Sequence, residues 1–137
     1  KELTPLKIIG TASRPETTAW LKDLGADHVI NHRNKLSEEI KENNLSEPDY
    51  VISLNGTEQH FEEIVKLIKP QGKFGLIDDP KEINIMAFKT KSVSTHIEFM
   101  YTRSMYLTED MQKQHDILNA VAEMIDAKKI KREGDLR

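Results

Sequence analysis

The feature that most constrains this sequence is the alternation of short apolar runs with segments of helical pattern. Apolar runs rich in branched residues occupy positions 6–12, 29–30, 50–54 and 73–77, and polar segments separate them. Such runs are typical of buried strands in a parallel sheet. Because strand–helix–strand crossovers are right-handed and return the chain parallel to itself, the alternation predicts an α/β fold with helices on both faces of a parallel sheet.

The first two connecting segments have weak helical patterns with clear ends. Pro15 suits the first turn of a helix, and Gly25 stands where a left-handed C-terminal cap is favoured. A second, weak helix is predicted over residues 36–42, with Leu36 and Ile40 facing the core. These segments connect the first three predicted strands.

The third connecting segment gives the clearest helix. Thr57 is a good N-cap residue, and Pro70 and Gly72 end the segment. Apolar residues recur at i, i+3, i+4 and i+7, which predicts a buried stripe of Phe61, Ile64, Val65 and Ile68.

The alternation changes after residue 80. Ile83, Ile85 and Ala87 alternate with polar positions, which predicts an extended edge element, and residues 93–99 offer a further strand. A long final helix is predicted from a capped start at Thr108 to the basic residues 128–129, which suit the negative end of a helix.

Composition excludes several classes of protein. The chain of 137 residues fits one domain, and no apolar run approaches the roughly 20 residues of a membrane span. The formal charge of −3 is spread without a basic stripe, so nucleic acid is not expected as a partner. Without cysteine there are no disulfides, which favours a cytoplasmic location.

Candidate ligand-binding residues follow the strands. In an open parallel sheet, ligands bind beyond the carboxyl ends of the strands. This rule selects a rim of residues, namely Ser13, Arg14, Asn31, Asn55, Gly56, Ile77 and Asp78.

The first strand ends in Ser13 and Arg14, where an NAD-binding domain commonly has an acidic residue for the ribose 2′-hydroxyl. A guanidinium pairs well with a 2′-phosphate, so this pair favours NADP(H). The alternative is that Ser13 caps the next helix and Arg14 is solvated. The pair Asn55-Gly56 also has a simpler interpretation as a turn.

Other chemistries have weaker support. The pair Asp78-Asp79 is typical of a magnesium-binding receiver domain, but the first strand lacks the acidic pair that such a domain needs. The five histidines show no i, i+4 pairing, so no metal site is predicted. No G-x-S-x-G sequence supports a hydrolase.

The run TASRPETTAWLKDLGADHVINH, residues 11–32, resembles the cofactor domain of medium-chain dehydrogenases and reductases. The resemblance is to the quinone oxidoreductase-like branch, also called zinc-type alcohol dehydrogenases, and LGADHVIN is its most specific piece. Residues 49–78 and the sequence IEFMYTRSMY at residues 97–106 continue the likeness over nearly the whole chain.

The resemblance implies a Rossmann-type cofactor domain of an NADP(H)-dependent alcohol dehydrogenase or reductase. The enzyme would transfer hydride between the nicotinamide and a carbonyl, quinone or activated alkene as its small-molecule substrate. In this geometry Ser13 and Arg14 would hold the 2′-phosphate and Asn31 would lie near the adenine. The ribose would contact Asn55 and Gly56. The nicotinamide would lie near the backbone of Ile77 and Asp78 and near two residues after the last strand, Phe99 and Met100.

The resemblance also sets the expected domain organisation. Residues 1–137 are expected to be a partial domain that lacks the first strand, its glycine loop and the catalytic domain, with residues 1–4 ending a preceding helix. The chain alone is then expected to be inactive, with no catalytic residue and no zinc ligand. In this family the element around residues 83–88 and the strand that follows it commonly pair with their counterparts across a homodimer axis, which would close an otherwise exposed sheet edge. The alternative is a free-standing α/β binding or interaction module, which the DNA upstream of Lys1 would distinguish.

Overall fold

The computed structural model describes residues 3–131. The chain forms two compact units. The described residues of the first unit are 3–10, 14–29 and 100–131, and those of the second are 11–13 and 30–99. Within the described range, no helix combines the length and apolar character needed to cross a bilayer.

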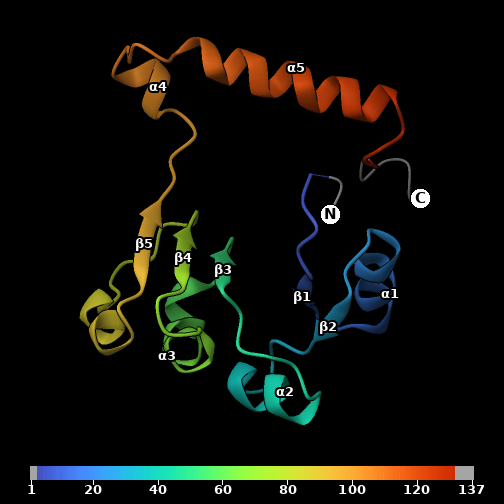
Figure 1. The fold of residues 1–137 in the computed structure, drawn as a ribbon, viewed down its shortest axis with the longest axis vertical. Helices are drawn as coiled ribbons and strands as arrows, with labels where there is room; N and C mark the ends of the chain where they lie inside the picture. Colours follow the sequence, from blue (N-terminus) through green and yellow to red (C-terminus); the bar gives the residue numbers. More distant parts are fainter. Residues whose placement is uncertain (1–2, 132–137) are drawn as a thin grey trace. The chain divides into compact units, whose positions relative to one another are not determined.

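The elements follow the predicted alternation of strands and helices (Figure 1). Strand β1 (Ile9–Thr11) pairs with β2 (His28–Ile30), and helix α1 (Pro15–Asp23) connects them. Strands β3 (Tyr50–Ser53), β4 (Lys73–Leu76) and β5 (Ser94–Ile97) form a second, parallel sheet. Helix α2 (Leu36–Glu42) leads to β3, and α3 (Thr57–Leu67) connects β3 to β4. The predicted α/β fold with parallel strands is confirmed.

The LGADHVIN segment has a local structural explanation. Gly25 adopts φ +97° after the end of α1, as predicted, and its N–H donates to the Lys22 carbonyl. The chain can then turn into β2, where the Asp27 carboxylate accepts a hydrogen bond of 2.8 Å from the Ile8 N–H. A glycine and an aspartate at these two positions therefore join α1 and β2 to the segment that leads into β1.

The core of the second unit is aromatic. Phe61 of α3, Phe74 of β4 and Phe88 are buried, with ring centroids 5.1–5.9 Å apart. Edge-on and tilted ring pairs at such distances add to the burial of apolar area. Ile64 and Ile68 extend the core, as the predicted stripe requires. On the other face of β3, the side chains of Tyr50 and Ile52 are exposed.

The predicted extended element over residues 83–88 is wrong. Ile85–Lys91 form a 3-10 helix, η1. The Asn84 side chain caps it by accepting a hydrogen bond from the Met86 N–H, and Phe88 is inserted into the core with an exposed fraction of only 2%. The alternation of apolar residues was misleading because capping by Asn84 and burial of Phe88 outweigh strand propensity here.

Several boundaries also differ from the predictions. The N-cap of α3 is Gly56, and Thr57 is the first helical residue. The final helix, α5 (Gln112–Asp126), follows a turn at Thr108 instead of starting there. A short helix, α4 (Thr102–Met105), was not predicted. The expected helix end at residues 1–4 falls partly outside the described residues, while Leu3 lies in a turn and Thr4 has no regular structure.

Candidate functional site

The ends of the three parallel strands in the second unit form the candidate site. Register pairs Ser53 with Leu76, and Leu76 with Ile97. The ladder continues beyond the strands, because the Ile77 N–H donates to the Ser53 carbonyl and the Glu98 N–H to the Leu76 carbonyl. The predicted residues Asn55, Gly56, Ile77, Asp78 and Phe99 therefore follow neighbouring strands at one edge of this sheet.

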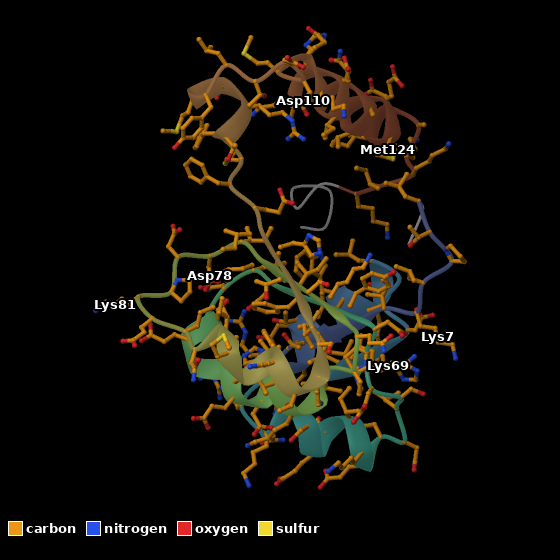
Figure 2. The ribbon with its side chains drawn as sticks, turned by 60° about the vertical axis from the view of Figure 1, so that its left-hand side comes forward. Lys7, Lys69, Asp78, Lys81, Asp110 and Met124 are labelled. Atoms are coloured by element: carbon orange, nitrogen blue, oxygen red, sulfur yellow. The ribbon has the colours of Figure 1, made fainter. Side chains whose placement is uncertain are left out.

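Asp78, which is labelled in Figure 2, lies just after the end of β4 and connects this edge to α3. Its carboxylate accepts hydrogen bonds from both the N–H and the hydroxyl of Thr57 at the start of α3. These bonds lower the pKa of Asp78, with a further contribution from the Gly56 N–H. The carboxylate therefore serves as a cap for α3 and interacts favourably with the positive end of the helix dipole.

Ser53 extends this contact into the protein interior. Its hydroxyl lies 2.6 Å from the Thr57 hydroxyl, and both residues are buried, Thr57 fully. Since the single hydroxyl proton of Thr57 goes to Asp78, Ser53 donates to Thr57. The resulting chain runs from Ser53 through Thr57 to Asp78 and ties the ends of β3 and β4 to the start of α3.

Gly56 connects β3 to this capped helix with a left-handed backbone, at φ +70°. A side chain there would be strained whatever the space around it. The His60 ring lies against this position, 3.6 Å from where a Cβ atom would be. The same ring is 6.2 Å from that of His32, measured between centroids.

Asn31, at the end of β2, is held by local hydrogen bonds. Its side-chain oxygen accepts from the Arg33 N–H at 3.0 Å, and its own N–H donates to Glu39 of α2. Hydrogen bonds from the Asn34 side chain and the Asn31 backbone lower the pKa of Glu39. Asn31 is thus a fixed part of the turn that leads from β2 to α2.

Arg14 is exposed in the first unit, where it follows β1 after Ala12 and Ser13. Its Nη2 donates to the Thr17 hydroxyl at 3.3 Å, and its Nε lies 3.5 Å from an exposed Glu16 carboxylate. The N-cap of α1 is Arg14, which makes no side-chain capping bond. The part of the alternative in which Ser13 caps this helix is therefore wrong, and the part in which Arg14 is solvated is confirmed. Exposed ion pairs of this kind are weak and easily exchanged. Met100, the last predicted residue, also belongs to the first unit and is exposed.

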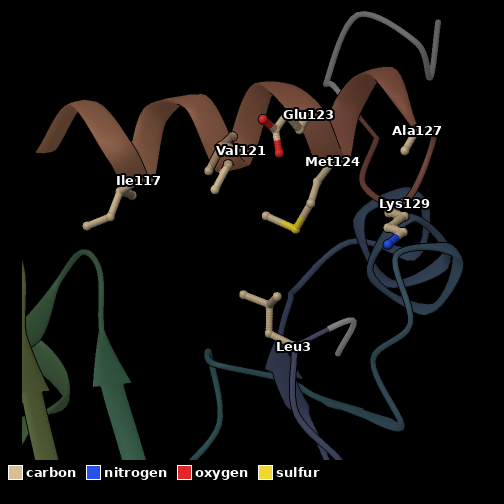
Figure 3. A pocket seen from close by; sticks show the side chains of 8 residues that line it. Leu3, Ile117, Val121, Glu123, Met124, Ala127 and Lys129 are labelled. Carbon is tan, nitrogen blue, oxygen red and sulfur yellow. The ribbon is translucent and has the colours of Figure 1, made fainter. Parts of the chain in front are cut away.

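The first unit has its own depression of about 520 Å³ beside α5 (Figure 3). Leu3, Ile117, Val121 and Met124 give it an apolar lining, with Glu123 and Lys129 at its border. None of the predicted site residues lines it. Its lining offers few of the convergent polar groups by which ligand sites fix orientation.

A metal centre does not fit the described part of the chain. Residues 3–131 contain no group of three or more His, Asp or Glu side chains placed to hold an ion, and the sequence contains no Cys. Zinc sites in proteins use three or four such ligands.

Sequence similarity to known proteins identifies the family of this chain. The profile of the zinc-binding dehydrogenases matches residues 4–120. The chain belongs to the zinc-binding dehydrogenase family. This dehydrogenase-family chain is 36% identical over 124 residues to a zinc-type alcohol dehydrogenase-like protein of Staphylococcus epidermidis. The match covers 88% of this chain and 36% of that protein.

Solved structures agree with this assignment. A protein from Rhizobium etli CFN 42, assigned to the zinc-dependent alcohol dehydrogenases, matches with a TM-score of 0.90 and 48% identity over 93% of this chain and 38% of its own. An alcohol dehydrogenase from Escherichia coli CFT073, solved with NADH, has a TM-score of 0.66 at 19% identity, covering 91% of this chain and 34% of its own. At that identity the second match shows the fold alone. The dehydrogenase-family chain thus spans little more than a third of each of these proteins.

Sequence reasoning missed the side chains that organise this edge. The sequence pattern predicts a strand for Ser53 and a helix cap for Thr57. It selects Asp78 as a rim residue or as half of an acidic pair, and not as the partner of Thr57. Their spacing contained a signal, since Ser and Thr flank an Asn-Gly turn and an acidic pair ends the next strand. Parallel register then places that carboxylate beside the turn.

Proposed function

We propose that the full-length protein is an NADP(H)-dependent oxidoreductase and that this chain contributes part of its cofactor-binding domain. The substrate class proposed is a carbonyl, a quinone or an activated alkene, reduced by hydride transfer. Membership of the zinc-binding dehydrogenases and similarity to alcohol dehydrogenase-like proteins support the reaction class. Under this proposal the chain by itself is inactive.

The observation that carries the cofactor preference is the exposed Arg14 at the end of β1. Rossmann-type domains for NAD commonly place an acidic residue at this position, and an arginine here accommodates a 2′-phosphate. Among the residues that the structure describes, the Arg14 guanidinium contacts an exposed carboxylate and a hydroxyl on its own helix. It can therefore turn to a phosphate and form two charge-assisted hydrogen bonds, while the half-buried Ser13 hydroxyl adds a third.

The remaining predicted residues fit the less charged parts of the dinucleotide. Asn31 would lie near the adenine, and Asn55 and Gly56 near the ribose. The nicotinamide would lie against the backbone of Ile77 and Asp78, with Phe99 and Met100 near the ring. When bound, the cofactor supplies the hydride, while these residues bind and orient it.

The division of the sheet supports the proposal that this is a partial domain. In a doubly wound sheet of order 3-2-1-4-5-6, strand 1 pairs with strands 2 and 4. The two sheets here match strands 2 and 3 (β1 and β2) and strands 4 to 6 (β3 to β5). The sequence contains no G-x-G-x-x-G, which follows strand 1 in that fold. We therefore propose that another segment of the full-length protein supplies the central strand and the pyrophosphate-binding loop.

The proposal is tested by measuring the binding of NADPH and NADH to the full-length protein and to its Arg14→Ala variant. Loss of the charge-assisted contact should weaken NADPH binding by about 1.5–3 kcal/mol, or roughly 10- to 150-fold, and leave NADH nearly unchanged. Lys22→Ala, at the opposite end of α1, is the matched control for loss of one exposed positive charge. An unchanged NADPH/NADH ratio in Arg14→Ala would contradict the 2′-phosphate assignment.

The substrate class needs a separate assay. Oxidation of NADPH by the full-length protein can be followed with a simple aldehyde, a benzoquinone and an α,β-unsaturated ketone. The proposal expects turnover with at least one of the three. Tight NADPH binding without turnover in any of them would leave the cofactor assignment intact and reject the proposed reaction.

A further inference from the structure

The hydrogen bonds of Asp78 place its negative charge at the N-terminus of α3, where a helix usually presents a positive partial charge. The N-terminus of a helix presents unpaired N–H groups and the positive end of a dipole, and it commonly binds phosphate. Helix α3 begins directly at the rim after β3 and has 11 residues, so its dipole is fully developed. Its N-terminus would ordinarily attract a phosphate of a dinucleotide.

In this chain the Asp78 carboxylate already occupies the N-terminus of α3. Asp78 accepts the Thr57 N–H at 3.0 Å and the buried Thr57 hydroxyl, and the Gly56 N–H also stabilises the carboxylate. Glu58 adds a second acidic group in the first turn and accepts a hydrogen bond from the Lys81 N–H at 3.4 Å. An incoming phosphate would meet occupied donors and two carboxylates.

We propose that Asp78 is a specificity-determining residue. Its carboxylate occupies the N-terminus of α3 as an anion supplied by the protein itself. The rim at the ends of β3 and β4 therefore rejects phosphate and accepts an uncharged part of the dinucleotide. The groups it admits are hydroxyls or a carboxamide. This inference rests on the proposed function for the identity of the ligand. The blocked helix end itself is a property of this chain and can be tested without the cofactor.

The test uses inorganic phosphate as the probe and this chain as the protein. Phosphate is titrated into the wild type and into Asp78→Ala while the backbone amide signals of Gly56 and Thr57 are followed by NMR. Asp79→Ala is the matched control, since it removes the neighbouring, exposed carboxylate. We expect a saturable shift of both amide signals in Asp78→Ala only, with a phosphate affinity at least about tenfold above that of the wild type.

A saturable phosphate shift at Gly56 and Thr57 in the wild type would overturn the proposal, whatever the variants do. So would a folded Asp78→Ala variant with no response to phosphate. If Asp78→Ala does not fold, Asp78→Asn replaces it, because the amide keeps the size of the side chain and removes its charge. Failure of the full-length protein to bind NADPH or NADH would reject the proposed function and leave the phosphate result unaffected.

Discussion

Thr57 and Asp78 are joined by two hydrogen bonds, one from the backbone N–H of Thr57 and one from its hydroxyl. The residues belong to different elements, α3 and the segment after β4, and the contact fixes the edge of the sheet at which the candidate site lies. Its contribution to stability can be measured without reference to any ligand.

Thr57→Val should destabilise the chain by about 1–3 kcal/mol, because it leaves the buried Ser53 hydroxyl without its acceptor and removes one donor to Asp78. Asp78→Asn should also destabilise it, and the double variant should lose less than the sum of the two. Urea unfolding of the four proteins gives the coupling energy. Additive losses, or a loss as large in Asp79→Asn, would show that the contact is energetically unimportant.

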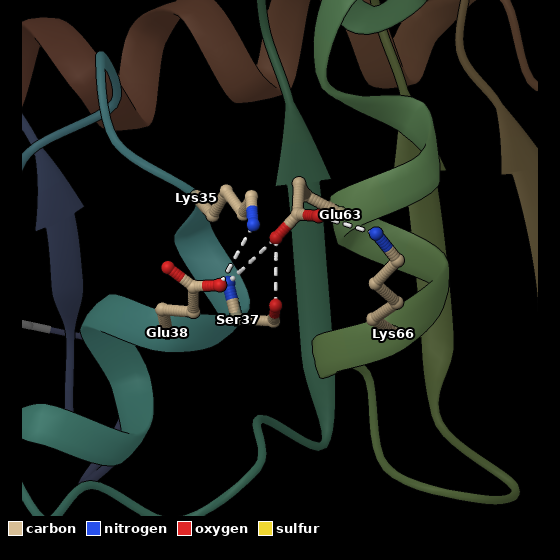
Figure 4. Close-up of polar contacts among 5 residues, drawn as sticks. All are labelled: Lys35, Ser37, Glu38, Glu63 and Lys66. Carbon is tan, nitrogen blue, oxygen red and sulfur yellow. Dashed lines mark hydrogen bonds and ion pairs between the residues drawn. The ribbon is translucent and has the colours of Figure 1, made fainter.

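A second carboxylate makes folding stability depend on pH. Glu63 of α3 accepts hydrogen bonds from the N–H and the hydroxyl of Ser37 in α2, and from Lys66 (Figure 4). Its side chain is only 15% exposed. Burial by itself would raise the pKa of Glu63, but the bonds from Lys66 and Ser37 outweigh it and lower the pKa to about 2.

Because the folded-state pKa lies below the ordinary value of 4.5, this carboxylate stabilises the fold above pH 4.5, and the stabilisation is lost as pH falls toward 2. Glu63→Gln should therefore be less stable at pH 7, by at most about 3 kcal/mol, with the difference shrinking over that window. Denaturation at pH 7, 4 and 3 measures this. Glu62→Gln, one position away and exposed, is the control, and an equal pH dependence of its stability would contradict the assignment.

Phe88 is the side chain that makes η1 part of the core. Phe88→Ala removes a ring packed against Phe61 and Phe74 and should cost about 3–5 kcal/mol of stability. The control is Met86→Ala in the same segment, where the side chain is 61% exposed and the loss should be below about 1 kcal/mol. If residues 83–88 formed an extended edge instead, the two losses would be similar.

The homodimer remains a proposal, and β5 is the element to test. Within the described chain β5 pairs with β4 alone, and Ile97 at its end is 74% exposed. An exposed strand edge, with its unpaired N–H and carbonyl groups, can pair with a second copy. We expect a dimer at micromolar concentration in analytical ultracentrifugation and a monomer for Ile97→Lys with an unchanged circular dichroism spectrum. A monomeric wild-type chain at this concentration would contradict the homodimer proposal.

Local patterns predicted well where a residue's partner lies within a few positions. The cap at Gly25, the helix over residues 36–42 and the buried stripe of α3 depend on intervals of three or four residues, which a sequence displays directly. The predictions failed where a distant partner decides. Residues 85–91 form a 3-10 helix because Phe88 packs against α3 and β4, and the space that it fills exists only after both are in place.

The same limit applies to the candidate site. Strand ends select the rim residues, because every parallel strand finishes at the same edge. The side-chain role of Asp78 depends on a bond to a residue 21 positions away, which needs the register of β3 and β4 as well as the start of α3. The cofactor roles of these residues remain predictions until binding is measured.

Helix α3 is held at its other end as well. The Lys91 ammonium donates to the carbonyls of Lys66 and Ile68, at 2.7 and 2.6 Å. Helix ends usually fray, but here the Asp78 carboxylate accepts hydrogen bonds from the first turn of α3, and the Lys91 ammonium donates to the carbonyls at its end. α1, whose N-terminus has no side-chain cap, should open from that end. The amide hydrogens of the terminal turns of α3 should exchange with solvent almost as slowly as those at its middle.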